Sequence, residues 1–342
     1  MTRPGTENPF ATLAVWANKE DDGACADHGA APRARRGAHV AVLMGGLSSE
    51  RDVSLRSGAA CAKALEGEGF RTTQIDVARN ISTVLADLKP DVAFNALHGP
   101  FGEDGTVQGV LEMLRIPYTH SGLLASALAM NKDRAKTIMA AAGVPVPRGK
   151  VVARAEAAKA HVLPPPYVLK PIAEGSSFGV FIVPEGQAHP PQELTRADWA
   201  YGETLLAEPF IGGRELTCGV MGDRALGVIE IRAADGGWYD YNAKYSKGGS
   251  IHILPADLKQ NIYQEVQELA LRAHVALGCR GVSRADLRYD DRPGGTGELV
   301  VLEVNTQPGM TETSLVPEMA AFAGFSFGGL VRWMVEDASC DR

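Results

Sequence analysis

Two alternating segments separated by a turn sequence constrain the fold of this chain most strongly. The second segment, Leu299 to Asn305, is an apolar run that carries Glu303 as well as its final asparagine. The first, Gly281 to Asp290, alternates polar and apolar side chains, as a half-buried strand does. Between them, Asp291 to Gly297 contains a proline and three glycines, a composition typical of a turn. The sequence therefore predicts an antiparallel hairpin.

A hairpin centred on the paired glycines of this turn also predicts which side chains face one another. Asp286 falls opposite Glu303. Arg284 falls opposite Asn305, and residues two apart on a strand share a face, so all four point to one side. Carboxylate and amide oxygens on a rigid strand suit Mg²⁺, and we predict a magnesium site here. The alternative is a surface hairpin with ordinary charged residues, but charges embedded in apolar strands need partners.

Length and charge limit the class of protein. At 342 residues the chain is long enough for two or three domains. Its net charge of −7 argues against a nucleic-acid binder that relies on bulk electrostatics. Five scattered cysteines without a C-x-x-C pair indicate reduced thiols in the cytoplasm. No apolar run approaches the roughly 18 residues of a membrane span, so we expect no membrane partner.

The first part of the chain divides into an irregular start and a repeating pattern of strands and helices. Residues 1–38 are rich in Ala, Gly, Arg and Asp without a period, and we expect a disordered extension. From residue 39, apolar strands alternate with helices, which predicts parallel βαβ units with a ligand at the carboxyl ends of the strands. Glu50 and His98 each follow such a strand. Ser49 and Asp52 have the spacing of a capping box and predict a helix start.

Three further segments have features of a phosphate site. Glu174 to Gly179 is a glycine-rich loop just after Lys170, and its backbone N–H groups together with the lysine can hold phosphates. Lys132 stands at a helix boundary, where a solvated surface lysine is the alternative. Glu208 to Glu215 places two carboxylates around a glycine turn, which suits adenine and ribose, although a hinge between domains is also consistent. The glycine-rich loop alone is a plain turn, but beside the lysines and the metal patch it predicts phosphate binding.

Taken in order, these segments resemble the D-alanine–D-alanine ligases of the ATP-grasp superfamily from about residue 39 to the C-terminus. The resemblance rests on five motifs: Gly45 to Leu55, Ala96 to Gly105, Lys170 to Ser177, Lys244-Tyr245, and Glu303 to Met310. It implies an α/β fold (α+β overall) of three-domain ATP-grasp architecture. The implied domains are an N-terminal open parallel βαβ substrate domain at residues 39–130, a central ATP-grasp subdomain at 131–216 and a C-terminal ATP-grasp subdomain at 217–342.

The resemblance also implies the residues that bind ATP and metal. ATP would lie between the central and C-terminal subdomains, in contact with Lys132, Lys170, Glu208, Pro209, Ile211, Glu215 and Lys244. The hairpin residues match the ligands of two Mg²⁺ ions that bridge the phosphates, with Mn²⁺ able to replace Mg²⁺: Asp286, Glu303 and Asn305.

The two D-alanine sites follow from the same resemblance. Glu50 matches the residue that receives the ammonium of the first D-alanine, with His98 nearby. Ser176 and Tyr245 resemble the partners that tie the loops over the site to Glu50. Ser314 matches the position that holds the carboxylate of the second substrate.

The implied reaction joins two D-alanines for peptidoglycan synthesis. ATP phosphorylates the first D-alanine to an acyl phosphate, the amine of the second attacks the acyl carbon, and phosphate leaves. Arg284 and the Gly309 N–H would stabilise the oxyanion, a role worth about 3 kcal/mol per donor. By resemblance the enzyme is a cytoplasmic homodimer. Two residues depart from the family pattern: Asn131 replaces an aspartate beside the phosphate lysine, and Gln307 replaces a common serine.

Three other functions compete with this one. A D-alanine–D-lactate or D-alanine–D-serine ligase has the same fold, but the pair Lys244-Tyr245 resembles the dipeptide-forming type. A different ATP-grasp carboxylate–amine ligase is disfavoured by the Glu50 and His98 motifs. A non-catalytic nucleotide-binding regulator is disfavoured because all three predicted metal ligands are present.

Overall fold

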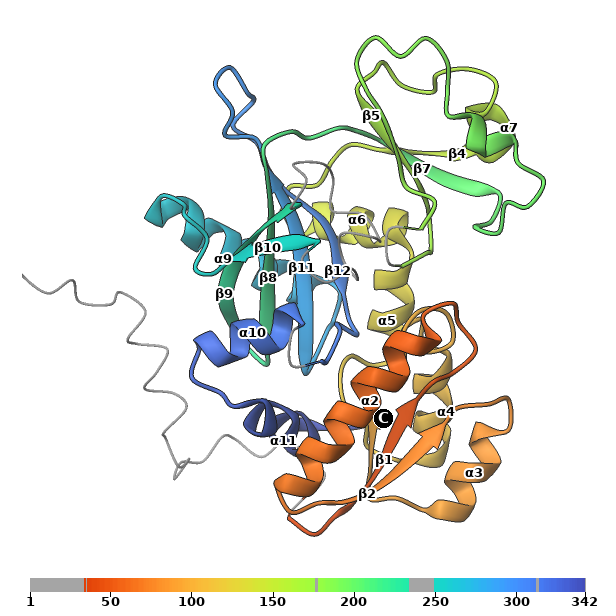
Figure 1. Cartoon of the computed structure of the whole chain (residues 1–342), viewed down its shortest axis with the longest axis vertical. Helices are drawn as coiled ribbons and strands as arrows, with labels where there is room; N and C mark the ends of the chain where they lie inside the picture. The colour runs from red at the N-terminus through yellow and green to blue at the C-terminus, as the bar shows by residue number, and fades with distance from the viewer. Residues whose placement is uncertain (1–33, 35, 176–177, 234–248, 312–313, 342) are drawn as a thin grey trace, which may run out of the picture.

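Three sheets and the helices around them make up the structure, a computed structural model that describes residues 34, 36–175, 178–233, 249–311 and 314–341 (Figure 1). Most of the predicted extension, residues 1–38, and the predicted loop residues Ser176, Lys244 and Tyr245 lie outside the described residues. The mixed α/β architecture predicted from the sequence is confirmed. No helix among the described residues is long and apolar enough to cross a membrane.

The N-terminal region forms a parallel sheet, as predicted, and its strand order is β2-β1-β3. Alternate residues of β1 pack on α2 at one face of the sheet and on α3 and α4 at the other. Because both faces are covered, the strand reads as an uninterrupted apolar run. The elements are β1 (His39–Met44), α2 (Arg51–Gly67), β2 (Arg71–Asp76), α3 (Ile81–Leu88), β3 (Val92–Asn95) and α4 (Thr106–Leu114).

The start of α2 differs from the predicted capping box. The helix begins after Glu50, and no side chain caps it. Ser48, rather than Ser49, organises this turn: its hydroxyl accepts from the Glu50 N–H at 3.2 Å and donates to the His98 carbonyl at 2.6 Å. The capping box was therefore wrong, because a tertiary contact to the loop after β3 replaces the local one.

A small antiparallel sheet in the order β4-β7-β5-β6 forms the second region and has its own core. It follows α5 and α6, which are separated at Asn131, where the sequence predicted a break. The elements are α5 (Leu123–Met130), α6 (Lys132–Ala141), β4 (Lys150–Ala153), α7 (Arg154–Ala157), β5 (Tyr167–Pro171), β6 (Phe181–Val183), η1 (Gln192–Thr195) and β7 (Thr204–Pro209).

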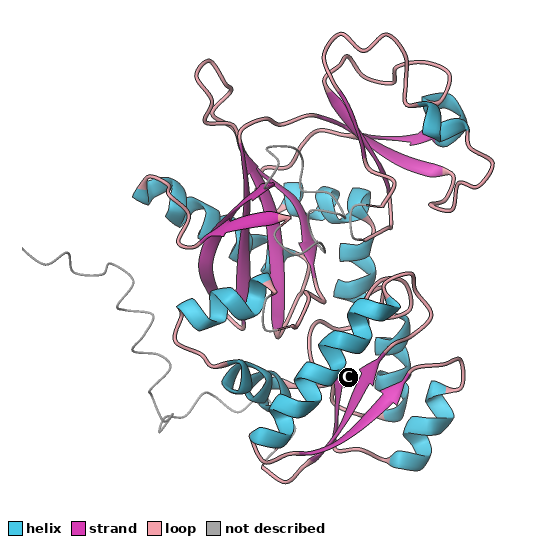
Figure 2. Ribbon diagram, in the orientation of Figure 1, coloured by secondary structure: helices cyan, strands magenta, loops and turns pink. Residues whose placement is uncertain are grey.

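The third sheet is antiparallel, in the order β10-β9-β8-β11-β12, and carries the predicted hairpin (Figure 2). Helix α9 packs on one face of this sheet, where it meets Cys218, Ala285 and Val301 in a common core. On the opposite face, Ile229 and Ile231 of β9 pack against the helix that follows the sheet, and the hairpin presents polar side chains. The elements are β8 (Arg214–Met221), β9 (Arg224–Ala233), β10 (Ser250–Ile253), α9 (Gln260–Ala276), β11 (Val282–Tyr289) and β12 (Leu299–Asn305).

The end of the chain returns to the N-terminal sheet. Helices α10 (Leu315–Phe322) and α11 (Phe327–Asp337) follow the third sheet, and α11 packs against α2 (Figure 1). The α11 residue Leu330 shares a buried core with Phe94 of β3. The C-terminal region therefore completes the N-terminal core, which fixes the first and third sheets relative to each other and shapes the space between them.

Candidate active site

The hairpin register agrees with the prediction. Asp286 of β11 pairs with Glu303 of β12. Arg284 pairs with Asn305, and a register shift follows Asp286 on the side toward the turn. The intervening Ala285 points to the opposite face and is buried in the core beneath α9. Apolar burial on one face therefore determines which way the four polar side chains point.

Asp286 is held by two neighbours on the same face of the sheet. The Arg284 guanidinium donates to its two carboxylate oxygens at 2.8 and 2.7 Å. The Thr217 hydroxyl of β8 donates to Oδ1 at 2.7 Å. A bidentate pair of this kind fixes both the arginine and the carboxylate in orientation.

The hairpin residues present oxygen donors, with one amide beside two carboxylates. No group of three or more His, Cys, Asp or Glu side chains suitable for a metal occurs among the described residues. The third donor is instead the Asn305 amide oxygen, which accepts from the Gln307 N–H at 3.1 Å. An oxygen-only set with few protein ligands fits Mg²⁺, which keeps several waters and binds substrate phosphates.

Lys132 joins this patch to the glycine-rich loop. Its ammonium lies 3.3 Å from a Glu303 carboxylate oxygen and donates to the Glu174 carbonyl at 2.6 Å. The preceding Asn131 is the N-cap of α6, and its side chain accepts from the Arg134 N–H at 3.1 Å. Asparagine and aspartate cap helices comparably, so this departure from the family pattern leaves the placement of the lysine intact.

A small cavity of about 100 Å³ lies between the second and third sheets. Its lining includes every described residue that the sequence assigned to ATP: Lys132, Lys170, Glu208, Pro209, Ile211 and Glu215. Arg288 also lines it and pairs with Glu215 at 3.3 Å, while donating to the Ile211 carbonyl at 3.1 Å. The arginine therefore holds the segment between β7 and β8 against the sheet.

Lys136, which was not predicted as a site residue, contacts Glu208 of this cavity lining. Lys136 is buried and lies 2.5 Å from one Glu208 oxygen, while Lys170 lies 2.7 Å from the other. Burial alone would raise the pKa of Glu208, but the two ammonium groups outweigh it and hold the pKa below its usual value. Burial and the charge of Lys170 lower the pKa of Lys136 to about 8, against the opposing effect of Glu208. The only sequence signal was the i, i+4 spacing with Lys132 on one helix face.

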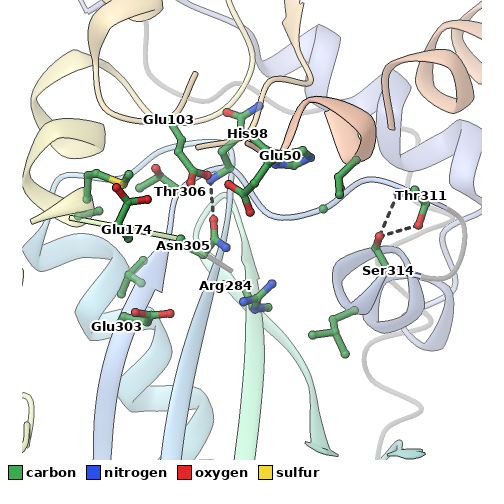
Figure 3. Close-up of a pocket in the computed structure, with 18 of the residues that line it drawn as sticks. Glu50, His98, Glu103, Glu174, Arg284, Glu303, Asn305, Thr306, Thr311 and Ser314 are labelled. Atoms are coloured by element: carbon green, nitrogen blue, oxygen red, sulfur yellow. Dashed lines mark hydrogen bonds between the residues drawn. The ribbon is translucent and has the colours of Figure 1, made fainter. Parts of the chain in front are cut away.

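A larger cavity of about 490 Å³ lies between the N-terminal region and the third sheet (Figure 3). It brings together the described residues that the sequence assigned to the two D-alanines and the oxyanion: Glu50, His98, Arg284, Gly309 and Ser314. The Ser314 hydroxyl lies 2.7 Å from that of Thr311 and accepts from the Thr311 N–H at 3.1 Å. A Cβ on Gly309 would lie 3.1 Å from the Ser314 hydroxyl, so a side chain there would crowd it.

Glu103 is a second carboxyl group at the Glu50 end that sequence reasoning did not assign. A Cβ on Gly175 would lie 3.2 Å from a Glu50 oxygen and 3.4 Å from a Glu103 oxygen, so both carboxyls face the glycine-rich loop. Burial and the charge of Glu50 raise the pKa of Glu103 to about 8. Its motif indicated only a loop, because the spacing could not show that this side chain turns inward.

His98 is held as a neutral ring. Its Nε2 lies 3.4 Å from the Ser57 hydroxyl, and the Gln307 backbone also forms a hydrogen bond with the ring. Burial lowers the pKa of His98 to about 4, so the imidazole is uncharged at neutral pH. It can orient a substrate by hydrogen bonding rather than by charge.

Gln307, the second departure from the family pattern, links the third sheet to the N-terminal sheet. Its side-chain amide donates to the Asn95 carbonyl, and its Oε1 accepts from the Asn95 side chain at 3.3 Å. Asn95 in turn donates to the Gly102 carbonyl at 2.9 Å, in the loop that carries Glu103. A buried pair of amides thus connects the segment after Asn305 to the loop that carries His98 and Glu103. No role for Gln307 was predicted from the sequence.

Replacing Gln307 with alanine is expected to lower the free energy of unfolding by about 1–3 kcal/mol, because the buried Asn95 groups lose their partners. Urea unfolding measures the loss. Gln192, an exposed residue of η1, provides the matched alanine control and should change stability little. Equal stability of the two variants would contradict a structural role for the amide pair.

Comparison with known proteins shows the family to which this chain is similar. A family model described as the D-ala D-ala ligase C-terminus matches residues 138–336, and one for the N-terminus matches residues 80–121. D-alanine–D-alanine ligases from Beijerinckia indica and Methylocella silvestris are 74% and 75% identical over 304 residues, which cover 89% of this chain and 99% of each relative. The D-alanine–D-alanine ligase of Bacillus anthracis complexed with ATP superposes with a TM-score of 0.72 at 29% identity, covering 88% of this chain and 97% of that one.

Two antiparallel sheets enclosing a lysine-lined cavity, beside an α/β region that closes a second cavity, define an ATP-dependent ligase of the ATP-grasp class. The family matches and the relatives narrow this class further. The chain belongs to the D-alanine–D-alanine ligase family. Its activity is the ATP-dependent joining of two D-alanines, a step of peptidoglycan synthesis.

Proposed function

We propose that the two cavities divide the substrates, with ATP bound along the smaller one and extending beyond it, and both D-alanines in the larger one. The observation that carries the proposal is that the cavities share Lys132, Glu174, Gly175 and Glu303 in their linings. A terminal phosphate at this junction would lie between the nucleotide and the amino acids, as direct phosphoryl transfer requires. Lys170 and Lys132 would hold the phosphates, and the segment after Glu208 would receive adenine.

The first step is phosphorylation of the first D-alanine. Its ammonium binds Glu50, which directs its carboxylate toward the junction where Lys132 lies. Mg²⁺ ions, or Mn²⁺ in their place, held by Asp286, Glu303 and Asn305 would neutralise charge on the phosphates when bound. Ser176 and Tyr245, which lie outside the described residues, would tie the covering loops to Glu50, and Lys244 would contact ATP.

The second step forms the peptide bond. The carboxylate of the second D-alanine binds Ser314, and its amine attacks the acyl phosphate carbon. Arg284 and the Gly309 N–H stabilise the oxyanion that develops, and phosphate leaves. Exclusion of water protects the acyl phosphate from hydrolysis.

We also propose the domain roles, the oligomeric state and the cellular compartment of this chain. Residues 39–130, 131–216 and 217–342 act as the substrate domain and the two ATP-grasp subdomains, by resemblance to the family. By the same resemblance we propose a homodimer in the cytoplasm, where ATP is available, acting without nucleic acid or membrane.

The metal assignment makes a direct prediction. EDTA should lower D-alanine-dependent phosphate release by at least ~100-fold, and added Mg²⁺ or Mn²⁺ should restore it, because several kcal/mol of charge stabilisation are lost. Phosphate release is measured with D-Ala, L-Ala, D-Ser and D-lactate, singly and in pairs, with products identified by mass. Glu303→Gln should raise the Mg²⁺ concentration needed for half-maximal rate. Full activity in EDTA would overturn the metal site. A D-Ala–D-Ser or D-Ala–D-lactate product at a comparable rate would overturn strict selectivity for D-alanine at the second site.

A further inference from the structure

A serine, a histidine and a glutamate form a hydrogen-bonded row at the Ser314 end of the larger cavity. Ser250 and His252 are two residues apart on β10, so both side chains point to the same face of the sheet. The Ser250 hydroxyl lies 3.2 Å from His252 Nε2, and His252 Nδ1 lies 2.8 Å from a Glu318 carboxylate oxygen. Ser250 and His252 both line the cavity.

The row lies beside the place proposed for the second substrate. Glu318 belongs to α10, one turn after Ser314, and its N–H donates to the Ser314 carbonyl at 3.0 Å. The same helix packs against β9, the neighbour of β10 in the sheet. Packing of α10 on this face therefore brings the carboxylate of Glu318 and the hydroxyl of Ser314 to one end of the cavity.

The hydrogen bonds determine which nitrogen of His252 is free to accept a proton. A carboxylate only accepts hydrogen bonds, so Nδ1 is the protonated nitrogen and donates its N–H to Glu318. Nε2 is then the basic nitrogen, and it accepts from the Ser250 hydroxyl. A carboxylate that orients an imidazole in this way leaves the opposite nitrogen as a proton acceptor.

The proposed reaction needs such an acceptor. The amino group of the second D-alanine is protonated at neutral pH and has no lone pair with which to attack an acyl phosphate. Among the described residues that line this cavity, His98 and His252 are the imidazoles. His98 lies at the Glu50 end, its ring is engaged by Ser57 and by the Gln307 backbone, and it is therefore poorly placed to serve the second substrate.

We propose that His252, oriented by Glu318, is the base that activates the second D-alanine; this rests on the proposed function, in which Ser314 holds that substrate. One ammonium proton passes to His252 Nε2, and the nitrogen lone pair forms the bond to the acyl carbon. The C–O bond to phosphate breaks, and the second proton lost by the nitrogen leaves with the phosphate. His252 then returns its proton to solvent, which completes the balance.

Other charged groups line the same cavity and set the field in which this transfer occurs. Arg284 of β11 and Arg56 of α2 contribute positive charge, and Lys132 does so at the ATP junction. The carboxyl groups among the lining residues are Glu50, Glu103, Glu174 and Glu303. Only Glu318, outside that lining, hydrogen-bonds the imidazole among the described acidic residues.

The test replaces the second D-alanine with hydroxylamine, which is uncharged near neutral pH and needs no base. His252→Asn should lower kcat for dipeptide formation by about 100-fold or more, the usual contribution of a general base. The same variant should form D-alanine hydroxamate from ATP, D-alanine and hydroxylamine at the wild-type rate. Glu318→Gln should lower kcat for the dipeptide less than His252→Asn does and also leave hydroxamate formation intact.

Each other outcome has a distinct meaning. If His252→Asn slows both products equally, the residue is structural and the proposal is wrong. If only the KM of the second D-alanine rises, His252 binds its carboxylate and is not a base. His189→Ala, at an exposed position, is the matched histidine control and should leave both products unchanged. Absence of hydroxamate with the wild type would instead contradict the acyl phosphate of the proposed function.

Discussion

Replacing Arg284 with lysine is expected to lower kcat by about 100- to 1,000-fold, the usual effect of losing an oxyanion donor. In the structure its guanidinium donates two hydrogen bonds to Asp286, at 2.8 and 2.7 Å. Lysine supplies a point charge without this planar fork, so it can neither hold Asp286 in the same orientation nor present the remaining N–H groups to the substrate. The KM for ATP should also rise, because Asp286 lines the smaller cavity and loses the guanidinium that holds its carboxylate in place.

Steady-state phosphate release with saturating D-alanine measures this effect. Arg196→Lys is the control, since Arg196 makes a similar two-bond pair with Asp198 on an exposed surface, at 2.9 and 2.8 Å. That variant should keep the wild-type kcat. An Arg284→Lys enzyme within about threefold of wild type would show that the oxyanion is stabilised elsewhere, since one donor normally contributes far more than that.

The hairpin of β11 and β12 shows what the sequence can predict. Alternation fixes the face of each strand, and a turn of known composition fixes the register, so the pairing of Asp286 with Glu303 follows from local information. The same holds for the parallel strands and for the helix break at Asn131. Each of these features was predicted from a pattern within a short segment of the chain.

The residues that sequence reasoning missed depend on contacts across the chain. Gln307 meets Asn95 across 212 residues, and no period or spacing connects the two. Lys136 lies four residues after Lys132 on α6, a spacing that is equally common between exposed lysines. Only the approach of β7 buries Lys136 beside Glu208. The role of Lys136 therefore results from tertiary packing, which no local sequence pattern indicates.

The second large effect is expected where Glu208 pairs with two buried lysines. Glu208→Gln should lower the free energy of unfolding at neutral pH by about 3–5 kcal/mol, because it leaves buried ammonium groups without a carboxylate. Lys136 is affected most, since Glu208 is its only ion-pair partner among the described residues. The KM for ATP should rise as well, because Glu208 and Lys170 line the smaller cavity. Glu203→Gln, which removes an exposed carboxylate paired with Arg154, is the control and should have little effect on either quantity.

The deficit of Glu208→Gln should shrink as the pH rises toward 8. In the wild type the pKa of Lys136 is about 8, below the usual lysine value of 10.5, so the unfolded chain binds more protons than the folded one between these values. Stability from this group therefore increases with pH across that interval. Without Glu208 the pKa of Lys136 falls further, so the variant begins to gain stability at a lower pH than the wild type does. Urea unfolding of both proteins from about pH 6 to about pH 9 measures the difference. A deficit that stays constant or grows with pH would show that the two groups do not form a charged pair.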